Sequence, residues 1–162
     1  MAGPGTSTRD REVRAISAEE TRLLRHKVLR PHQAPEELVY PGDTERDSLH
    51  VGAFVGGALV GVASVVRRPM AGESAESAEG AWQLRGMATL PGFRGRGLGA
   101  AMLRACIGHV ARSGGSTIWC NARTPAVDFY RKLGFETRGS EFEIPVSGPH
   151  FVMLRAVSAE DR

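Results

Sequence analysis

The feature that most limits the fold is a run of alternating glycines between two apolar segments. This run, Arg94-Gly95-Arg96-Gly97-Leu98-Gly99, follows the strand-like segment 81–90 and opens a stretch with apolar residues at helical spacing. Glycine permits a positive φ and a close approach of ligand to backbone, and the first amides of a helix lack intrahelical acceptors. The run therefore predicts a cradle for an anion such as pyrophosphate, with Arg94 and Arg96 adding positive charge.

Two other interpretations of the glycine run compete with this one. A surface turn with chance glycines is one, since the chain contains 20 glycines in 162 residues. A dinucleotide-binding fingerprint is the other, because 95–100 matches G-x-G-x-x-A. That fingerprint opens the first unit of a repeated α/β sheet, whereas here it starts at Gly95 and Asn121 replaces the expected acid. The context argues against a dinucleotide fold.

Local patterns predict ten regular elements in the order β-α-β-β-β-α-β-α-β-β. The strands are expected at 13–16, 49–55, 58–67, 81–90, 116–120, 135–144 and 150–157. The helices are expected between Ser17 and Pro31, between Leu98 and Ser113, and between Thr124 and Leu133. This order predicts a mixed α/β domain without internal repeats.

Caps and turns mark the ends of these elements. Ser17 and Glu20 have capping-box spacing, and Thr124 is the expected N-cap of the last helix, which Gly134 closes. The uncharged segment 49–66 is long enough to suggest a short membrane span. Its central Gly56-Gly57 pair and its β-branched residues favour a hairpin with a two-residue turn.

Length and charge limit the organisation and the partners. We expect a loose tail over 1–10, which lacks the apolar core of a signal peptide, and a single domain over 11–158. The acidic segment 69–80 is expected to be a flexible loop within that domain. The net charge is +3, and the basic residues are dispersed rather than clustered, so nucleic acid is not an expected partner. The hairpin interpretation of 49–66 means that a membrane is not an expected partner either.

The cysteines and histidines argue against a disulfide-stabilised protein and against a zinc protein. Cys106 and Cys120 form no C-x-x-C motif, which favours a reducing, cytoplasmic location. The five histidines lie far apart in the sequence, and no Cys/His set has zinc spacing. No metal cofactor is therefore expected.

The second half of the chain resembles the GNAT N-acetyltransferase superfamily in two motifs. Its motif A, Gln/Arg-x-x-Gly-x-Gly/Ala, is similar to 94–99 here. Its motif B resembles Asn121 followed by Ala126, Phe129-Tyr130 and Leu133-Gly134-Phe135. The element order is also similar to that fold across residues 13–157.

The resemblance implies a fold, a donor and a set of cofactor-binding residues. The fold is a central mixed, mostly antiparallel sheet with flanking helices, in which the strand holding Met87 splays from the next parallel strand. The donor is acetyl-CoA, whose pantetheine arm lies in that gap, and Gly86 is the expected site of a strand bulge. The cofactor-binding residues are Met87, Ala88, Thr89, Arg94, Gly95, Arg96, Gly97, Leu98, Gly99, Ala100 and Asn121.

The implied reaction is direct attack of an amine on the thioester in a ternary complex. A backbone amide near Met87 or Ala88 polarises the carbonyl, and Tyr130 is the implied acid for the leaving thiolate, with a core aromatic as its alternative role. Cys120 is expected to be a small buried hydrophobe rather than a nucleophile.

Several points of function stay open in the sequence. The base is His150, Glu143 or water, and His150 has a structural role in the turn after Gly148 as its alternative. The acceptor is a small-molecule or peptide amine of unidentified structure, and a homodimer is neither argued nor excluded. A non-catalytic acyl-CoA sensor on the same fold is the competing function.

Overall fold

A computed structural model describes residues 10–74 and 79–162 of the chain. Nearly all of the expected N-terminal tail, residues 1–9, lies outside the described residues, as does 75–78 of the expected acidic loop. The described residues fall into two compact units, 10–64 with Gly86–Cys106, and 65–74 and 79–85 with Ile107–Arg162. The single domain over 11–158 stays a prediction.

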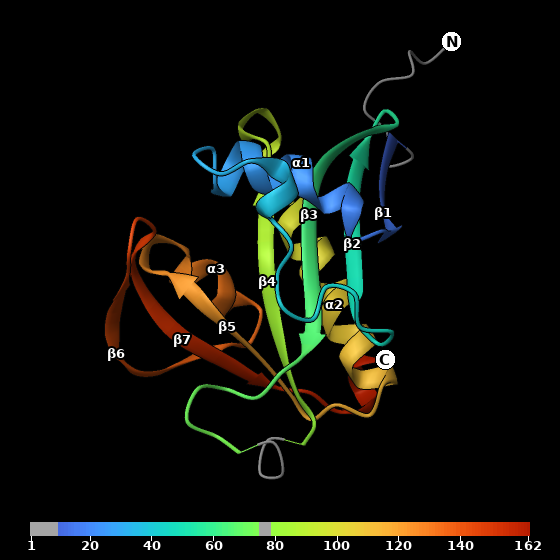
Figure 1. The fold of residues 1–162 in the computed structure, drawn as a ribbon. Coiled ribbons are helices and arrows are strands. Elements are labelled where there is room, and N and C mark those ends of the chain that lie inside the picture. Colours follow the sequence, from blue (N-terminus) through green and yellow to red (C-terminus); the bar gives the residue numbers. More distant parts are fainter. Residues whose placement is uncertain (1–9, 75–78) are drawn as a thin grey trace. The chain divides into compact units, whose positions relative to one another are not determined.

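Seven strands form one mixed sheet of order β1-β2-β3-β4-β5-β7-β6 (Figure 1). The sheet is mostly antiparallel, and β4 and β5 pair in parallel through Ala81–Gln83 and Thr117–Trp119. The expected mixed α/β fold is thus confirmed. The strands are β1 Arg11–Ile16, β2 Leu49–Val55, β3 Ala58–Arg67, β4 Ala81–Thr89, β5 Thr117–Arg123, β6 Glu136–Ile144 and β7 Gly148–Ala156.

The first expected helix is three short pieces rather than one continuous helix. A 3₁₀ turn at Glu19–Thr21 leads into α1, Arg22–Leu24, and then into a π-turn at Arg25–Leu29. The capping box is confirmed, because the Ser17 amide donates to the Glu20 carboxylate at 2.9 Å and the Glu20 amide donates to Ser17 Oγ at 3.1 Å. Hydrogen bonds to the Glu20 carboxylate from the backbone and from the side chain of Ser17 lower the pKa of that carboxyl.

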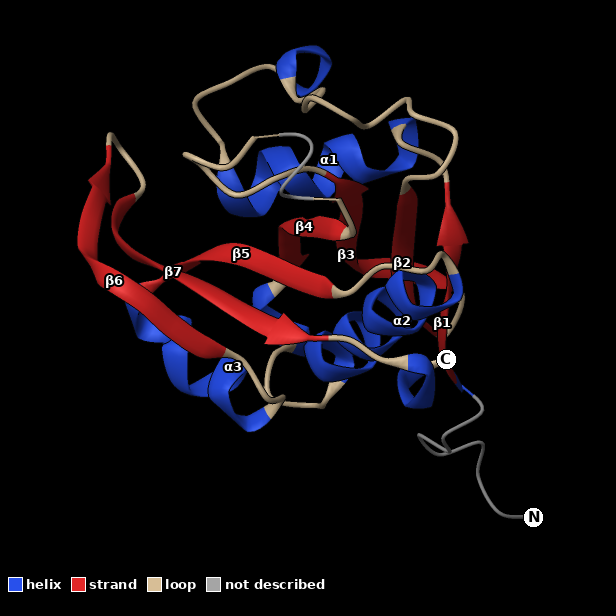
Figure 2. Cartoon of the chain, turned by 90° about the horizontal axis from the view of Figure 1, so that it is seen from below, coloured by secondary structure: helices blue, strands red, loops and turns tan. Residues whose placement is uncertain are grey.

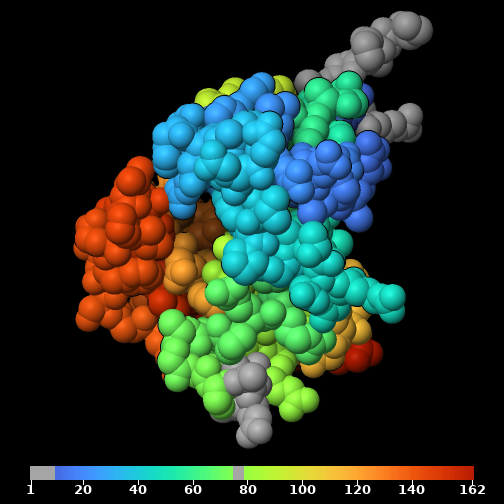
Figure 3. Space-filling view, in the orientation of Figure 1, coloured from blue at the N-terminus to red at the C-terminus, as the bar shows by residue number. Residues whose placement is uncertain are grey.

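Helices cover both faces of the sheet in the first unit. Leu24 of α1 forms one buried cluster with Val62 of β3 and Ala88 of β4. On the opposite face, a Cβ at Gly61 would lie 3.0 Å from Met102, in α2 (Leu98–Arg112). Figure 2 shows the two helices on opposite sides of these strands. In the space-filling view, the blue and cyan atoms of α1 and the segment after it form most of the visible surface of this unit (Figure 3).

In the second unit, helices pack on one face of the sheet. His109 of α2 contacts the buried Trp82 ring edge-on at 5.5 Å between centroids, and α3, Val127–Lys132, packs beside β5 and β6. The other face of this part of the sheet carries Ala81 and Trp119, which pack together with Met70 and Leu154.

The expected β-hairpin is confirmed, with the turn at Gly56 and Gly57. Their φ angles are +57° and +82°, so both need the left-handed region that glycine adopts readily. The segment that imitated a membrane span is thus β2 and most of β3. Among the described residues, the structure contains no helix long and apolar enough to cross a membrane.

Two predicted boundaries around Thr124 are wrong. Strand β5 runs to Arg123 rather than ending at Cys120, because antiparallel pairing with β7 continues to the Arg123–His150 pair. Thr124 does not cap the helix, since its hydroxyl donates to the Glu141 carboxylate at 2.7 Å. The chain instead passes through a 3₁₀ turn, Thr124–Ala126, before α3.

Gly115 is a position where packing rather than conformation excludes a side chain. A Cβ there would lie 2.5 Å from Val110 Cγ1 and 2.7 Å from Trp82 Nε1. We expect Gly115→Ala to lower the free energy of unfolding by about 1–3 kcal/mol through overpacking, measured by urea denaturation. The neighbouring Ser113→Ala should change it by less than about 0.5 kcal/mol, and equal effects of the two substitutions would contradict this packing.

Candidate active site

The glycine run forms an open loop at the start of α2. Gly95 and Gly97 have φ angles of +76° and +80° and are exposed. A Cβ at Gly95 would meet no heavy atom within 4 Å, and one at Gly97 would meet only Arg11 Nη2, at 3.7 Å. The loop backbone is therefore accessible, and the first amides of the 15-residue helix that follows have no acceptors within the helix. This geometry fits the phosphate groups of an acetyl-CoA molecule.

Three arginines surround this loop. Arg11 of β1 donates through Nη2 to the Arg96 carbonyl oxygen, and the Arg96 guanidinium lies 5.1 Å from the centre of the Phe93 ring. Arg94 donates through Nε to the Thr89 carbonyl oxygen at 3.1 Å. Arg11 could not be found from the sequence, because it lies 85 residues from Arg96 and no local pattern connects them.

The end of β4 carries the three residues expected to contact the pantetheine arm. Gly86 has φ +63° within the strand, a conformation that interrupts regular pleating at the position expected for a bulge. Ala88 is buried, while Met87 and Thr89 are partly exposed. Their main-chain contacts with a cofactor stay predictions.

Tyr130 lies in the second unit, on α3, and is 8% exposed. Its ring makes edge contacts with Phe129 and Phe135, at 5.1 Å and 5.4 Å between centroids. Its side chain also hydrogen-bonds to the thiol of Cys120 on β5. The phenol is thus held both by aromatic packing and by a contact with sulfur.

Cys120 is a buried thiol, as expected for a small hydrophobe. Burial raises its pKa to about 12, against a smaller lowering by the bond from Tyr130. Cys106 is fully buried in α2, and burial raises its pKa to about 12 as well. A thiol that stays protonated at neutral pH is a poor nucleophile, so the environment of Cys120 argues against an acyl-cysteine intermediate.

The structure does not bring Asn121 and Tyr130 to the same face of β5. Successive side chains of a strand point to opposite faces, and Tyr130 contacts Cys120, the residue before Asn121. Asn121 is exposed within the strand, where it pairs with Val152. A hydrogen bond from Asn121 to the pantetheine arm stays a prediction.

The two side chains considered as a base lie on neighbouring strands. His150 of β7 is 4% exposed, and its ring contacts Gly148 O at 2.7 Å through Nδ1. A carbonyl only accepts, so Nδ1 is the donor and the bond orders the turn, in line with the structural role. Glu143 of β6 pairs with Pro149 across the hairpin.

No metal centre is found among the residues that the structure describes: no three His, Cys, Asp or Glu side chains lie together as a possible ligand set.

The sequence of the chain is similar to those of known proteins. A profile of the acetyltransferase (GNAT) family matches residues 13–135. An uncharacterized N-acetyltransferase of Bacillus subtilis (strain 168), YitI, is 38% identical over 148 residues, which are 90% of this chain and 96% of that protein.

Solved structures of low sequence identity share the fold. Escherichia coli ElaA superposes with a TM-score of 0.70 at 17% identity, covering 90% of this chain and 99% of its own. Salmonella typhimurium YncA, a putative acetyltransferase solved with its cofactor acetyl-CoA, also gives 0.70 at 14% identity, covering 91% and 94%.

The chain therefore belongs to the GNAT acetyltransferase family. It is an acetyltransferase. The fold and family expected from the two sequence motifs are both confirmed.

The burial of the two thiols predicts their reactivity. At pH 8 a thiol of pKa about 12 is ionised in only about one molecule in 10⁴. We expect neither cysteine of the native protein to react with an aromatic disulfide reagent within minutes, and both to react at once in denaturant. Rapid labelling of Cys120 in the native protein, located by mass spectrometry, would contradict its burial.

Proposed function

We propose that this protein transfers an acetyl group from acetyl-CoA to a primary amine by direct attack in a ternary complex. The observation that carries the proposal is the accessible loop at Gly95–Gly97, with two positive φ angles directly before a long helix. Such a loop presents unpaired amides to an anion, and Arg94 and Arg96 add charge. The amides of 95–100 are the proposed ligands of the pyrophosphate.

The proposed acid is Tyr130. When the amine attacks, the carbon–sulfur bond breaks and the leaving thiolate of CoA takes up a proton. The Tyr130 hydroxyl, held on α3 by Phe129 and Phe135, supplies that proton or a hydrogen bond to the sulfur. Its contact with Cys120 supports this role, since the same hydroxyl already hydrogen-bonds to a sulfur atom.

The proposed electrophilic assistance comes from the backbone near Met87 and Ala88. An amide aimed at the thioester oxygen stabilises the charge that develops there during attack. Thr89 and Asn121 are the further proposed contacts of the pantetheine arm. The amine loses its proton to water, His150 or Glu143, and the contact of His150 with Gly148 supports a structural role for that histidine.

We also propose where the protein is located and what its partners are. Cys106 and Cys120 are both free and buried, which supports a reducing, cytoplasmic location. The acceptor is a small-molecule or peptide amine, and a homodimer stays an open prediction.

Binding of acetyl-CoA should stabilise the protein by mass action. At about 100-fold over Kd the gain is about 2.7 kcal/mol, seen as a rise in Tm. In Gly97→Val we expect most of this gain to be lost, because valine resists a φ of +80° and its branches enter the cradle. Gly114→Val is the matched control, with φ +79° and no heavy atom within 4 Å of its Cβ. That control should keep the full ligand-induced shift, and the same shift in Gly97→Val would remove the loop from the binding site.

Tyr130→Phe should separate catalysis from binding. The variant keeps the ring between Phe129 and Phe135 and removes only the hydroxyl. We expect kcat for CoA release with a verified amine to fall by about tenfold to a few hundredfold, the lower range of general acid catalysis. The Kd for acetyl-CoA should change by less than about twofold, as one neutral side-chain atom is removed away from the phosphates.

Cys120→Ala is the control for the lost contact with sulfur. It removes the thiol that Tyr130 contacts but keeps the phenol, so kcat should stay within about threefold of wild type. An unchanged kcat in Tyr130→Phe would assign the tyrosine to the core. Acetyl-CoA binding without turnover of any amine in a broad panel would instead support the sensor function.

A further inference from the structure

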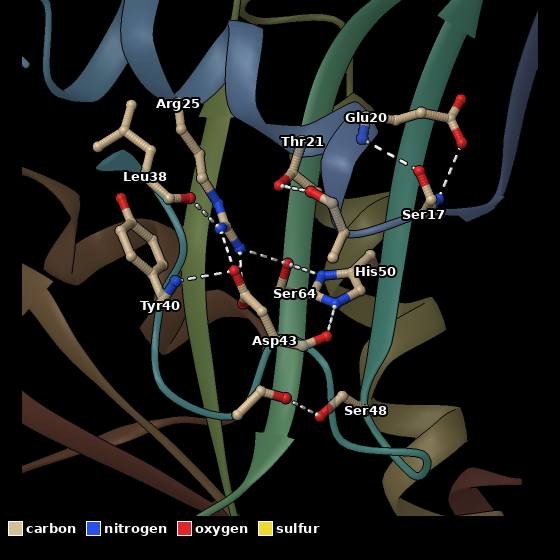
Figure 4. Close-up of polar contacts among 12 residues, drawn as sticks. Ser17, Glu20, Thr21, Arg25, Leu38, Tyr40, Asp43, Ser48, His50 and Ser64 are labelled. Atoms are coloured by element: carbon tan, nitrogen blue, oxygen red, sulfur yellow. Dashed lines mark hydrogen bonds and ion pairs between the residues drawn. The ribbon is translucent and has the colours of Figure 1, made fainter. Parts of the chain in front are cut away.

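Arg25 is a fully buried cation in the first unit, at the start of the π-turn that follows α1. Its Nη1 donates to Asp43 Oδ2 at 2.6 Å and to the Leu38 carbonyl oxygen at 2.9 Å. Its Nη2 donates to Asp43 Oδ1 and to Ser64 Oγ, both at 3.1 Å. Figure 4 shows the side chain reaching from the helix into the centre of these partners.

Asp43 is held from several sides. Burial alone would raise the pKa of its carboxyl, but the bonds from Arg25 and from the Tyr40 amide, together with the nearby charges, lower it. His50 contacts the Asp43 carbonyl oxygen at 2.8 Å through Nε2 and Ser64 Oγ at 2.6 Å through Nδ1. The segment around Leu38–Asp43 is therefore fixed to β2 and β3 from inside.

The flat edge of the guanidinium lies against Gly86 of β4. A Cβ at Gly86 would lie 3.1 Å from Arg25 Nε and 3.3 Å from Tyr40 Cε2. Tyr40 also packs against this side chain, since the guanidinium carbon of Arg25 lies 4.0 Å from the centre of the Tyr40 ring. Within the described part of the chain, Arg25 Nε is buried and has no hydrogen-bond partner. This edge of the arginine therefore contributes shape rather than hydrogen bonding.

Shape matters here because Gly86 has φ +63° and directly precedes Met87. The direction of the next peptide groups follows from this φ. The Arg25 side chain cannot move, because four hydrogen bonds and the Tyr40 ring hold it. With this neighbour fixed, the backbone at Gly86 can adopt only one arrangement. A buried ion pair contributes little net stability compared with apolar residues of the same volume, so the network has more value as a fixed template than as a source of stability.

We propose that Arg25 is a positioning residue, which holds the Gly86 turn and thereby aims the backbone of Met87–Thr89 at the pantetheine arm and thioester of acetyl-CoA. The inference rests on the proposed function, because it needs acetyl-CoA to bind along this strand. It predicts that substitutions which disturb the contact between Arg25 and Gly86 weaken binding of the acyl-pantetheine part. Binding of the phosphates at Gly95–Gly97 should stay unchanged.

The first experiment compares two ligands by calorimetry, acetyl-CoA and 3′-phosphoadenosine 5′-diphosphate, which lacks the pantetheine arm. In Gly86→Ala and in Arg25→Lys we expect acetyl-CoA to bind about tenfold more weakly, as for the loss of about one hydrogen bond. The nucleotide should bind within about twofold of wild type. Gly57→Ala is the matched control, with φ +82° and open space around its Cβ, and it should leave both affinities unchanged.

Equal weakening of both ligands, or the same selective loss in Gly57→Ala, would overturn the positioning role. Failure of wild-type protein to bind acetyl-CoA at all would overturn the proposed function instead, so the two failures are distinguishable.

The second experiment needs no ligand and does not alter Gly86 or Arg25. Asp43→Asn removes the charge that fixes the guanidinium, and Glu45→Gln removes an exposed charge from the same segment. Hydrogen exchange should quicken about tenfold at the amides of Met87 and Ala88 in the first variant only. The amides of Ile118 and Cys120 should not change. Uniform acceleration, or none at Met87, would show that the network is merely structural.

Discussion

A buried guanidinium needs a carboxylate and further acceptors for its terminal N–H groups, and this requirement shapes the first unit. Arg25 obtains them from Asp43, Leu38 and Ser64. A lone charge in that position would carry a desolvation cost of several kcal/mol. The segment between α1 and β2 therefore has to fold back over the strands, because only there can Asp43 reach the arginine. One electrostatic constraint thus places a long irregular segment that contains little regular structure of its own.

The second unit is organised by apolar packing instead. Trp82 and Ile118 are fully buried beneath the helices, and Cys120 adds a small side chain on the same face, where the Tyr130 side chain hydrogen-bonds to it. A thiol is a weak hydrogen-bond partner, so little free energy opposes an exchange of that contact for another sulfur. A stronger acceptor at position 120 would hold the phenol in a bond that is costly to break.

Local sequence signals predicted the elements whose ends are set locally. The Gly56-Gly57 turn and the capping box at Ser17 depend on residues a few positions apart, and both are confirmed. Boundaries set by distant partners were wrong. Strand β5 continues to Arg123 because β7 offers pairing groups there, and Thr124 turns from the helix to Glu141, 17 residues away.

The same distinction explains which parts of the site could be read from sequence. The glycine loop could be predicted because the proposed binding groups there belong to the backbone, and the glycines that expose them leave a visible pattern in the sequence. Arg25 gave no such signal, since its partner Asp43 is 18 residues away and Ser64 is 39 away. An arginine between α1 and a polar segment is indistinguishable in sequence from an exposed one.

The contrast between the glycine loop and Arg25 arises because the proposed contacts with acetyl-CoA are made mainly by main-chain groups. Amides of 95–100 and of Met87–Thr89 are the same in any residue except proline, so the residues at those positions are constrained by conformation, not by side-chain chemistry. The side chains that influence these main-chain contacts are those that pack against the backbone and hold it in place. Gly86, where Arg25 and Tyr40 leave little room for a Cβ, is the point at which that constraint becomes visible. In such a site, the same buried contacts stabilise this fold over others and place the groups that take part in the reaction.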